Sequence, residues 1–295
     1  MAYEFEQRTD WRNVSQGNPE TILFAEDLLR YEQAHADAHT EITALGQKMI
    51  VSDTDPGNVP DGTVWIQPVP ESSYLDSVPG LLARWQVDKL NAADGTVVSS
   101  FAPTAGTWAT PLASASGPSL VHSGVNGRKV LAFDGVNDYL DADHPDIAGA
   151  STEFIVCNLQ TAGTSGGRAI SSITSASYRA VRLSSTPGNG GMLTSGTAPN
   201  SIYDAWSHTS GWRVVAAVFD GATSRLHPHK RTAIAGATNL ALQSDLRLGR
   251  GPATSTEYSR IDIADLAIVN GALTDVQIKA VMDELAVRYG QTLGS

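Results

Sequence analysis

The feature that most constrains this chain is a long series of short apolar runs separated by turn signals, over residues 80–295. The turn signals are Asp-Gly pairs at 94–95, 134–135 and 220–221, and Asn-Gly pairs at 126–127 and 189–190. The runs that read as strands are 80–85, 129–133, 139–140, 153–159, 168–173, 180–183, 213–219, a run from 226, 246–249 and 261–269. Many short strands joined by tight turns predict a mainly β fold, an antiparallel β-sandwich.

The last part of the chain leaves this pattern and predicts a single helix. Thr274 stands where an N-cap is expected, and Gln277 follows at the spacing of a capping box. Gly290 stands where a glycine commonly ends a helix. The apolar stripe between them consists of Ile278, Val281, Leu285 and Tyr289.

Residues 1–50 predict a different structure, a helix from residue 18 to about residue 50. Apolar residues recur there at alternating steps of four and three, the heptad spacing of a coiled coil. Charged residues fill the other positions, so this narrow stripe needs a partner, either the following domain or copies of the same helix. We favour copies and expect a trimeric coiled-coil stalk, because His35 and Tyr31 suit a threefold seam better than a two-stranded one. The seam consists of Phe24, Leu28, Tyr31, His35, Ala38, Ile42, Leu45 and Met49.

Residues 51–79 are rich in Pro, Asp and Gly and predict a linker with one short strand at 63–67. Pro68, Pro70 and Pro79 make the end of this segment extended and stiff. We therefore expect three parts: an attachment segment and stalk over 1–50, the linker over 51–79, and a jelly-roll head over 80–295.

Charge and cysteine content exclude several classes of protein. The 295 residues hold 20 Lys+Arg against 31 Asp+Glu, a formal net charge of -11. Such a balance disfavours a nucleic-acid groove and an anionic membrane surface, since both need clustered Lys and Arg. The single cysteine, Cys157, excludes an internal disulfide framework and a Cys-rich metal site, and its apolar strand predicts a buried thiol.

The chain shows neither a membrane span nor a secretory leader in its sequence. No apolar run approaches the ~18 residues that a spanning helix needs. The first residues are acidic and aromatic, whereas a signal peptide begins basic and then turns apolar. We expect a protein made in the cytoplasm and not inserted into a membrane.

Four stretches of the large section resemble the concanavalin A-like, laminin-G-type jelly rolls. They are Leu-Ala-Arg-Trp at 82–85 with the Asp-Gly that follows, Phe-Asp-Gly-Val-Asn-Asp-Tyr-Leu at 133–140, Trp-Arg-Val-Val-Ala-Ala-Val-Phe-Asp-Gly at 212–221, and Ile-Ala-Asp-Leu-Ala-Ile at 263–268 with the segment through the last helix. They occur in the order of that family and cover residues 80–290. The resemblance implies a jelly-roll sandwich of the kind found in lectins.

The first third is similar in style to structural proteins of bacteriophage tails. The charged helix followed by Ser-Asp-Thr-Asp-Pro at 52–56 and Asp-Gly-Thr-Val-Trp-Ile at 61–66 resembles the shaft of a tail fibre. This resemblance implies a virion protein made in the host cytoplasm and released by lysis. It implies an N-terminus attached to other tail proteins and a head that binds a host cell-surface glycan.

Glycoside hydrolases of similar fold carry two carboxylates on one strand face, flanking the bond that is cut. After the linker the only glutamates are Glu153, Glu257 and Glu284, and they form no alternating acidic motif. We therefore expect binding without cleavage and no enzymatic activity. Two alternatives remain open: a polysaccharide-degrading hydrolase, and a purely structural tail or baseplate protein.

Two clusters could hold a metal ion. Asp134, Asp138 and Asp141 form the one calcium candidate, but an Asx-turn, in which the carboxylates bind backbone N–H groups, is favoured. Apart from possible calcium, no cofactor is expected. His227 and His229 have the spacing of a zinc pair but no third ligand, so a solvated hairpin is favoured.

Sugar sites usually combine an exposed aromatic ring with polar side chains. Trp85 and Trp212 lie in strand patterns and are assigned to the core. Other aromatic residues lie in polar, glycine-rich segments beside arginine and histidine. The candidate carbohydrate-binding residues are Tyr178, Arg179, Tyr203, Trp206, His208, Tyr258 and Arg260.

Overall fold

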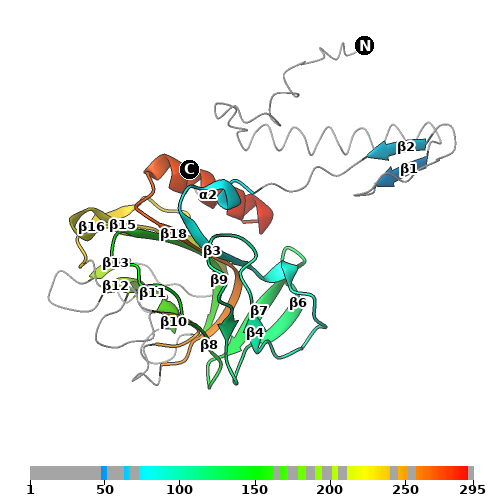
Figure 1. The fold of residues 1–295 in the computed structure, drawn as a ribbon, viewed down its shortest axis with the longest axis horizontal. Coiled ribbons are helices and arrows are strands. Elements are labelled where there is room, and N and C mark those ends of the chain that lie inside the picture. Colours follow the sequence, from blue (N-terminus) through cyan, green and yellow to red (C-terminus); the bar gives the residue numbers. More distant parts are fainter. Residues whose placement is uncertain are drawn as a thin grey trace, which may run out of the picture. The chain divides into compact units, whose positions relative to one another are not determined.

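The computed structural model describes residues 48–51, 63–66, 73–161, 167–171, 179–183, 190–194, 201–204, 211–239, 245–251 and 257–291 (Figure 1). The chain divides into two compact units, Met1–Ser72 and Ser73–Ser295. Within the described residues, no helix is long and apolar enough to cross a membrane.

In the first unit, strand β1 (Lys48–Val51) pairs in parallel with strand β2 (Thr63–Ile66). The strand expected at 63–67 is confirmed. The helix expected to run to about residue 50 is wrong at its end, because Met49 lies in β1 opposite Val64 and is not part of a helical seam. Backbone pairing between two short runs rich in β-branched residues prevails there over the heptad spacing. The other seam positions, Phe24 to Leu45, lie outside the described residues.

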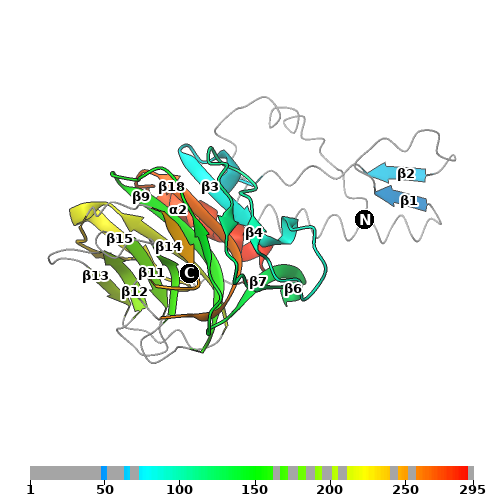
Figure 2. The ribbon, with the colours of Figure 1, turned by 60° about the horizontal axis from the view of Figure 1, so that its bottom comes forward.

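The second unit contains two antiparallel sheets, seen as layers in Figure 2. The back sheet has the order β16-β15-β14-β9-β18-β7-β6, with β3 also pairing with β18. Its strands are β3 (Leu81–Gln86), β6 (Ser119–Val125), β7 (Arg128–Asp134), β9 (Ser151–Thr161), β14 (Trp212–Phe219), β15 (Ser224–His227), β16 (Ile234–Gly236) and β18 (Arg260–Asn270).

The front sheet has the order β13-β12-β11-β10-β17-β8-β5-β4. Its strands are β4 (Ser100–Phe101), β5 (Leu112–Ala113), β8 (Leu140–Ala142), β10 (Gly167–Ser171), β11 (Arg179–Leu183), β12 (Gly190–Thr194), β13 (Ser201–Asp204) and β17 (Leu246–Leu248). Short 3-10 turns lie at η2 (Leu75–Ser77), η3 (Val87–Lys89) and η4 (Gly221–Thr223). The antiparallel β-sandwich expected from the turn signals is confirmed.

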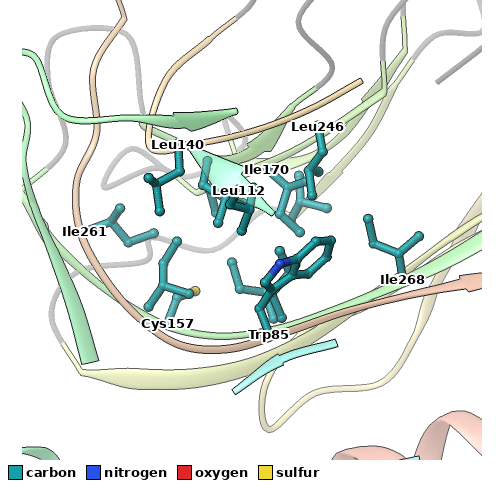
Figure 3. Packing of buried hydrophobic residues seen from close by; sticks show 14 of the residues in the cluster. Trp85, Leu112, Leu140, Cys157, Ile170, Leu246, Ile261 and Ile268 are labelled. Carbon is teal, nitrogen blue, oxygen red and sulfur yellow. The ribbon is translucent and has the colours of Figure 1, made fainter. Parts of the chain in front are cut away.

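The main core lies between the two sheets. Figure 3 shows side chains of the front sheet meeting side chains of the back sheet. Trp85, assigned to the core from the sequence, is buried there. Cys157 is also fully buried, as expected, and burial raises the pKa of its thiol to about 12. The labelled residues of this core are Trp85, Leu112, Leu140, Cys157, Ile170, Leu246, Ile261 and Ile268.

A second core lies on the other side of the back sheet, where helix α2 (Asp275–Arg288) covers β9 and β14. Both faces of these two strands are therefore buried, which explains their nearly continuous apolar sequences. The helix confirms its sequence signals. Thr274 and Gln277 form the capping box, and Gly290 has a φ of 61° just beyond the last turn. The expected apolar stripe is buried in this second core; its members are Ile278, Val281, Leu285 and Tyr289.

A buried ion pair connects the parts of the second unit on the helix side of the back sheet. Arg84 of β3 is fully buried, and its Nε and Nη2 donate to the two carboxylate oxygens of Asp265 on β18, at 3.1 and 2.7 Å. The hydroxyl of Tyr289, at the end of α2, donates to the same carboxylate at 3.0 Å. The ion pair thus joins two strands and the helix.

The segment before β3 is held by the same network. Arg84 Nη1 donates to Asp76 Oδ1 at 2.8 Å and to the hydroxyl of Ser73. Glu284 of α2 accepts from the Ser73 hydroxyl and from the Leu75 backbone N–H. Residues 73–79, part of the expected linker, therefore belong to the second unit, and Leu75 is fully buried.

Replacing Arg84 by Met should lower the free energy of unfolding by about 3–5 kcal/mol, because Asp265 is left as an uncompensated buried charge. Urea unfolding followed by tryptophan fluorescence measures the change. The double variant Arg84→Met/Asp265→Leu is the matched control and should recover most of the loss, since the stranded charge is gone. A loss below about 1 kcal/mol for Arg84→Met would contradict the assigned role.

Candidate functional site

The structure describes four of the seven candidate carbohydrate-binding residues. Tyr178, Trp206 and His208 lie outside the described residues. Tyr203 of β13 is 49% exposed, Arg260 is exposed at the start of β18, and Tyr258 is partly buried just before it. Arg179 is fully buried.

The assignment of Arg179 to a carbohydrate site is wrong, because its side chain points into the sandwich. Its Nη1 donates to Ser151 Oγ at 2.7 Å and its Nη2 to the Gly149 carbonyl at 2.6 Å. The guanidinium lies 5.6 Å from the centre of the Phe219 ring. Burial lowers the pKa of Arg179, and the charge of the buried Glu153 opposes that shift. Arg179 is a core residue that connects the two sheets.

Side chains along β11 point alternately to the two faces of the sheet, and this decides which of its two arginines faces outward. Val181 and Leu183 belong to the core between the sheets, and Arg179 has the same parity. Arg182 has the opposite parity, so it lies on the outer face of the front sheet. The apolar residues Val181 and Leu183 are the sequence signal that Arg182, and not Arg179, faces outward.

A row of residues crosses this outer face at right angles to the strands. Tyr203 of β13 is opposite Gly191 of β12, Gly191 is opposite Arg182 of β11, and Arg182 is opposite Arg168 of β10. A β-carbon at Gly191 would lie 2.0 Å from the carbonyl oxygen of Ile202, so this position accepts no side chain. We call Tyr203, Gly191, Arg182 and Arg168 the outer row.

The two arginines of the outer row differ in their partners. Arg168 Nε donates to Glu257 Oε2 at 3.0 Å, and both side chains are largely buried. For Arg182 the described part of the chain provides no hydrogen bond or ion pair, and its Nε is shielded from solvent. Arg182 therefore differs from Arg84, Arg168 and Arg179, each of which has a defined polar partner.

Beside the outer row, arginine and tyrosine side chains stack on one another. Arg247 donates to both carboxylate oxygens of Asp141 at 2.7 Å and lies 5.1 Å from the centre of the Tyr139 ring. Arg250 lies 5.4 Å from the same ring and 4.8 Å from the ring of Tyr258. Cation–π stacks of this kind fix both partners in place. Tyr258 therefore belongs to a stacked cluster next to Arg168, and Arg247 of this cluster lies on β17, about four strand spacings, or ~19 Å, from β13 with Tyr203.

Two residues of the calcium candidate, Asp134 and Asp138, stabilise the turn that contains them. Asp134 Oδ1 accepts from the backbone N–H groups of Val136 and Asn137, and Asp138 accepts from the N–H of Asp134. Asp141 is paired with Arg247. The favoured Asx-turn is confirmed. Among the described residues, no group of His, Cys, Asp or Glu side chains is arranged to hold a metal ion.

The expected solvated hairpin at His227 and His229 is only partly correct. His227 lies in β15, 3.6 Å from Asp275. His229 is only 6% exposed, and its Nδ1 accepts from the backbone N–H of Val214 at 3.2 Å. The His229 ring lies against β14, where its Nδ1 is the hydrogen-bond acceptor for the backbone N–H of Val214. Burial, with the charges of Lys230 and Arg213, lowers the pKa of His229 to about 4.

The lowered pKa of His229 predicts an acid-sensitive stability. In the unfolded chain this histidine binds a proton below its usual pKa of about 6.5, while the folded protein keeps it neutral down to about pH 4. The unfolded state therefore gains protons first, and the free energy of unfolding falls by about 2 kcal/mol as pH drops from 6.5 to 4.5.

Urea unfolding at several pH values checks this prediction. His229→Gln keeps an acceptor for the Val214 N–H but does not titrate, so its stability should depend less on pH in this window. His122→Gln controls for removing a histidine elsewhere. Equal pH slopes for the wild type and His229→Gln would refute the assignment.

The three glutamates of the second unit are all engaged in the structure. Glu257 is bound to Arg168, Glu284 belongs to the network around Arg84, and Glu153 is buried between the sheets. On the outer face of the front sheet, Asp141 is held by Arg247. Within the described residues, these carboxylates do not form the exposed, facing pair that glycoside hydrolysis requires.

No protein-family model matches the chain, and no curated protein matches it. Solved structures of similar fold include a Trypanosoma rangeli sialidase in complex with a difluoro-KDN compound, with a TM-score of 0.51 and 12% identity. The match covers 82% of this chain and 37% of the sialidase, so the chain spans less than half of that protein.

A second similar structure is domain 4 of AbnA, a GH43 extracellular arabinanase from Geobacillus stearothermophilus, in complex with arabinotriose. Its TM-score is 0.52 at 16% identity, and the match covers 68% of this chain and 98% of that domain. At these identities the likeness concerns the fold alone. The class defined here is an antiparallel β-sandwich with a helix on its back sheet.

Proposed function

We propose that the second unit is a glycan-binding head that binds a host cell-surface glycan without cleaving it. The observation that carries this proposal is the outer row, in which an exposed tyrosine ring lies in line with two arginines. Sugar rings stack on exposed aromatic faces, and polar side chains beside the ring orient the hydroxyl groups. Tyr203 provides the ring, and Arg182 and Arg168 provide the donors.

The arabinanase domain supports this proposal. It is a separate domain of a glycan-degrading enzyme, it aligns with this chain over 98% of its length, and it was solved with arabinotriose. A sandwich of this kind can thus take up a short sugar chain. The stack of Tyr139, Arg250 and Tyr258 would extend the same surface beyond Arg168.

A second candidate function is glycoside hydrolysis. The origin of the similar structures favours it, since one is a sialidase and the other belongs to an arabinanase. Four carboxylates in the described part of the head favour binding alone, because arginine partners or burial engage Glu153, Glu257, Glu284 and Asp141. Asp143 and Asp245, which hydrogen-bond to each other, are the described carboxyl pair that a hydrolase would have to use. Release of reducing ends from cell-wall glycans would decide for the hydrolase.

We further propose that the chain is a bacteriophage tail fibre or receptor-binding protein, a trimer attached to other tail proteins through its N-terminus. The heptad spacing from Phe24 to Leu45 and the tail-like segments at 52–56 and 61–66 support this. Three heads on one stalk bind a repetitive cell surface more tightly than one head, because the second contact is intramolecular. A purely structural tail protein would use the same stalk without a sugar site.

Tyr203→Ala should lower the binding of the full chain to isolated cell envelopes or to a glycan array by about tenfold, the loss of one stacking contact. Tyr74→Ala is the matched control, because Tyr74 is 44% exposed but lies in the turn before β3. Binding that is unchanged by Tyr203→Ala, or reduced equally by Tyr74→Ala, would contradict the assigned site.

Sedimentation of the full chain should give a mass of about three times 31.1 kDa. Ile42→Asp should break the trimer, because three carboxylates would meet in one seam layer. Binding to cell envelopes should then fall much further than binding of a small sugar to a single head. Ala36→Asp, outside the seam, is the control. A monomeric wild-type chain would disprove the stalk.

A further inference from the structure

We propose that the glycan bound by the outer row is acidic, and that Arg182 pairs with a carboxylate of one of its sugars. This inference rests on the proposed glycan-binding function and specifies its ligand class. It starts from the partners of the arginines on the front sheet, which are not equivalent.

Arg182 is a charged side chain without a polar partner among the described residues. Its Nε is shielded from solvent, and it makes neither a hydrogen bond nor an ion pair with the described residues. A shielded guanidinium donor is costly to leave unpaired. A carboxylate is the partner that fits the fork of a guanidinium through two parallel hydrogen bonds. Arg247 and Asp141 show this arrangement on the same face.

Arginine side chains gather on the outer face of the front sheet, although the chain as a whole is negative. Arg168, Arg182, Arg247 and Arg250 lie on or beside this face, and the carboxylates of Asp141, Glu257, Asp143 and Asp245 lie on or beside it as well. The formal net charge of the chain is -11. The local excess of positive charge is at Arg182 and Arg168, which have one carboxylate, Glu257, between them, and such an excess attracts an anionic ligand.

The pairing of strands places two positive charges directly opposite each other. Arg182 of β11 faces Arg168 of β10 across the sheet, and like charges in such cross-strand pairs are destabilising. Glu257 compensates Arg168. An anionic ligand on Arg182 would compensate the second charge, so the arrangement is stable with ligand and unfavourable without it.

The spacing along the outer row suits a short sugar chain. Two strand spacings, about 10 Å, separate Tyr203 from Arg182, and Gly191 between them has no side chain. One sugar can stack on Tyr203 while the carboxylate of a neighbouring sugar reaches Arg182. Sulfated sugars share the anionic chemistry, and the experiment below separates the two sources.

The test measures binding of the full chain to four probes by calorimetry: an oligogalacturonate, the same oligosaccharide fully methyl-esterified, dextran sulfate and dextran. We expect the oligogalacturonate to bind at least tenfold more tightly than its neutral ester, with an affinity that falls as salt rises. Equal affinity for acid and ester, or binding to dextran sulfate alone, would overturn the assignment of a carboxylate.

Variants connect the preference to Arg182. Arg182→Gln keeps a polar side chain without the charge and should lower oligogalacturonate binding about tenfold without changing binding of the ester. Arg182→Lys keeps the charge without the fork and should lose less. Lys279→Gln, which removes an exposed charge on α2, is the control. An acid preference unchanged by Arg182→Gln would also overturn the inference.

The outcomes separate this inference from the proposed function. Binding of neutral sugars that depends on Tyr203 but not on Arg182 leaves the glycan-binding head in place and rejects the acidic ligand. Absence of binding to all four probes and to cell envelopes rejects both. Circular dichroism of each variant confirms that a loss of binding is not a loss of fold.

Discussion

The buried pair of Arg84 and Asp265 is the interaction on which the second unit depends. It joins β3 to β18, and through Tyr289 and Asp76 it seats helix α2 and the segment before β3 on the same sheet. An apolar contact could hold two of these parts together, but a guanidinium with defined partners fixes their relative orientation as well. Helix α2 thereby covers the side of the back sheet that faces away from the main core.

Arginine has two roles in this molecule, and the partners distinguish them. Arg84 and Arg179 are enclosed by the fold, with carboxylate, hydroxyl and carbonyl acceptors from several segments of the chain. Arg182 lies on a sheet face, one residue beyond the apolar Val181, and the described residues supply no acceptor for it. The buried arginines Arg84 and Arg179 thus have defined hydrogen-bond acceptors, whereas Arg182 is a functional candidate because the described residues give it no acceptor.

Much of the sandwich could be predicted from the sequence, including the short strands β8, β11 and β17, but strands β4, β5, β6, β12, β13 and β16 were not expected. The runs at 153–159, 213–219 and 261–269 were found because burial on both faces makes them apolar throughout. Strand β6 contains His122, Ser123 and Gly124, and β12 begins with two glycines; tertiary pairing defines these strands rather than local pattern. In the proposed site, Tyr203 was selected from its polar, glycine-rich setting, although it lies in strand β13 and not in a loop. Arg182 was not among the candidates, because they were chosen by polar setting and not by the alternation that Val181 and Leu183 define along β11.

The place of β18 in the back sheet has a consequence for how the protein is made. This strand pairs with β9 on one side and with β7 and β3 on the other, yet it follows all of them in the chain. Its partners therefore leave the ribosome long before the strand that joins them. Contacts of such sequence separation slow folding, and the waiting strands expose apolar edges meanwhile. The head should thus depend on chaperones or on rapid completion of synthesis more than its size suggests.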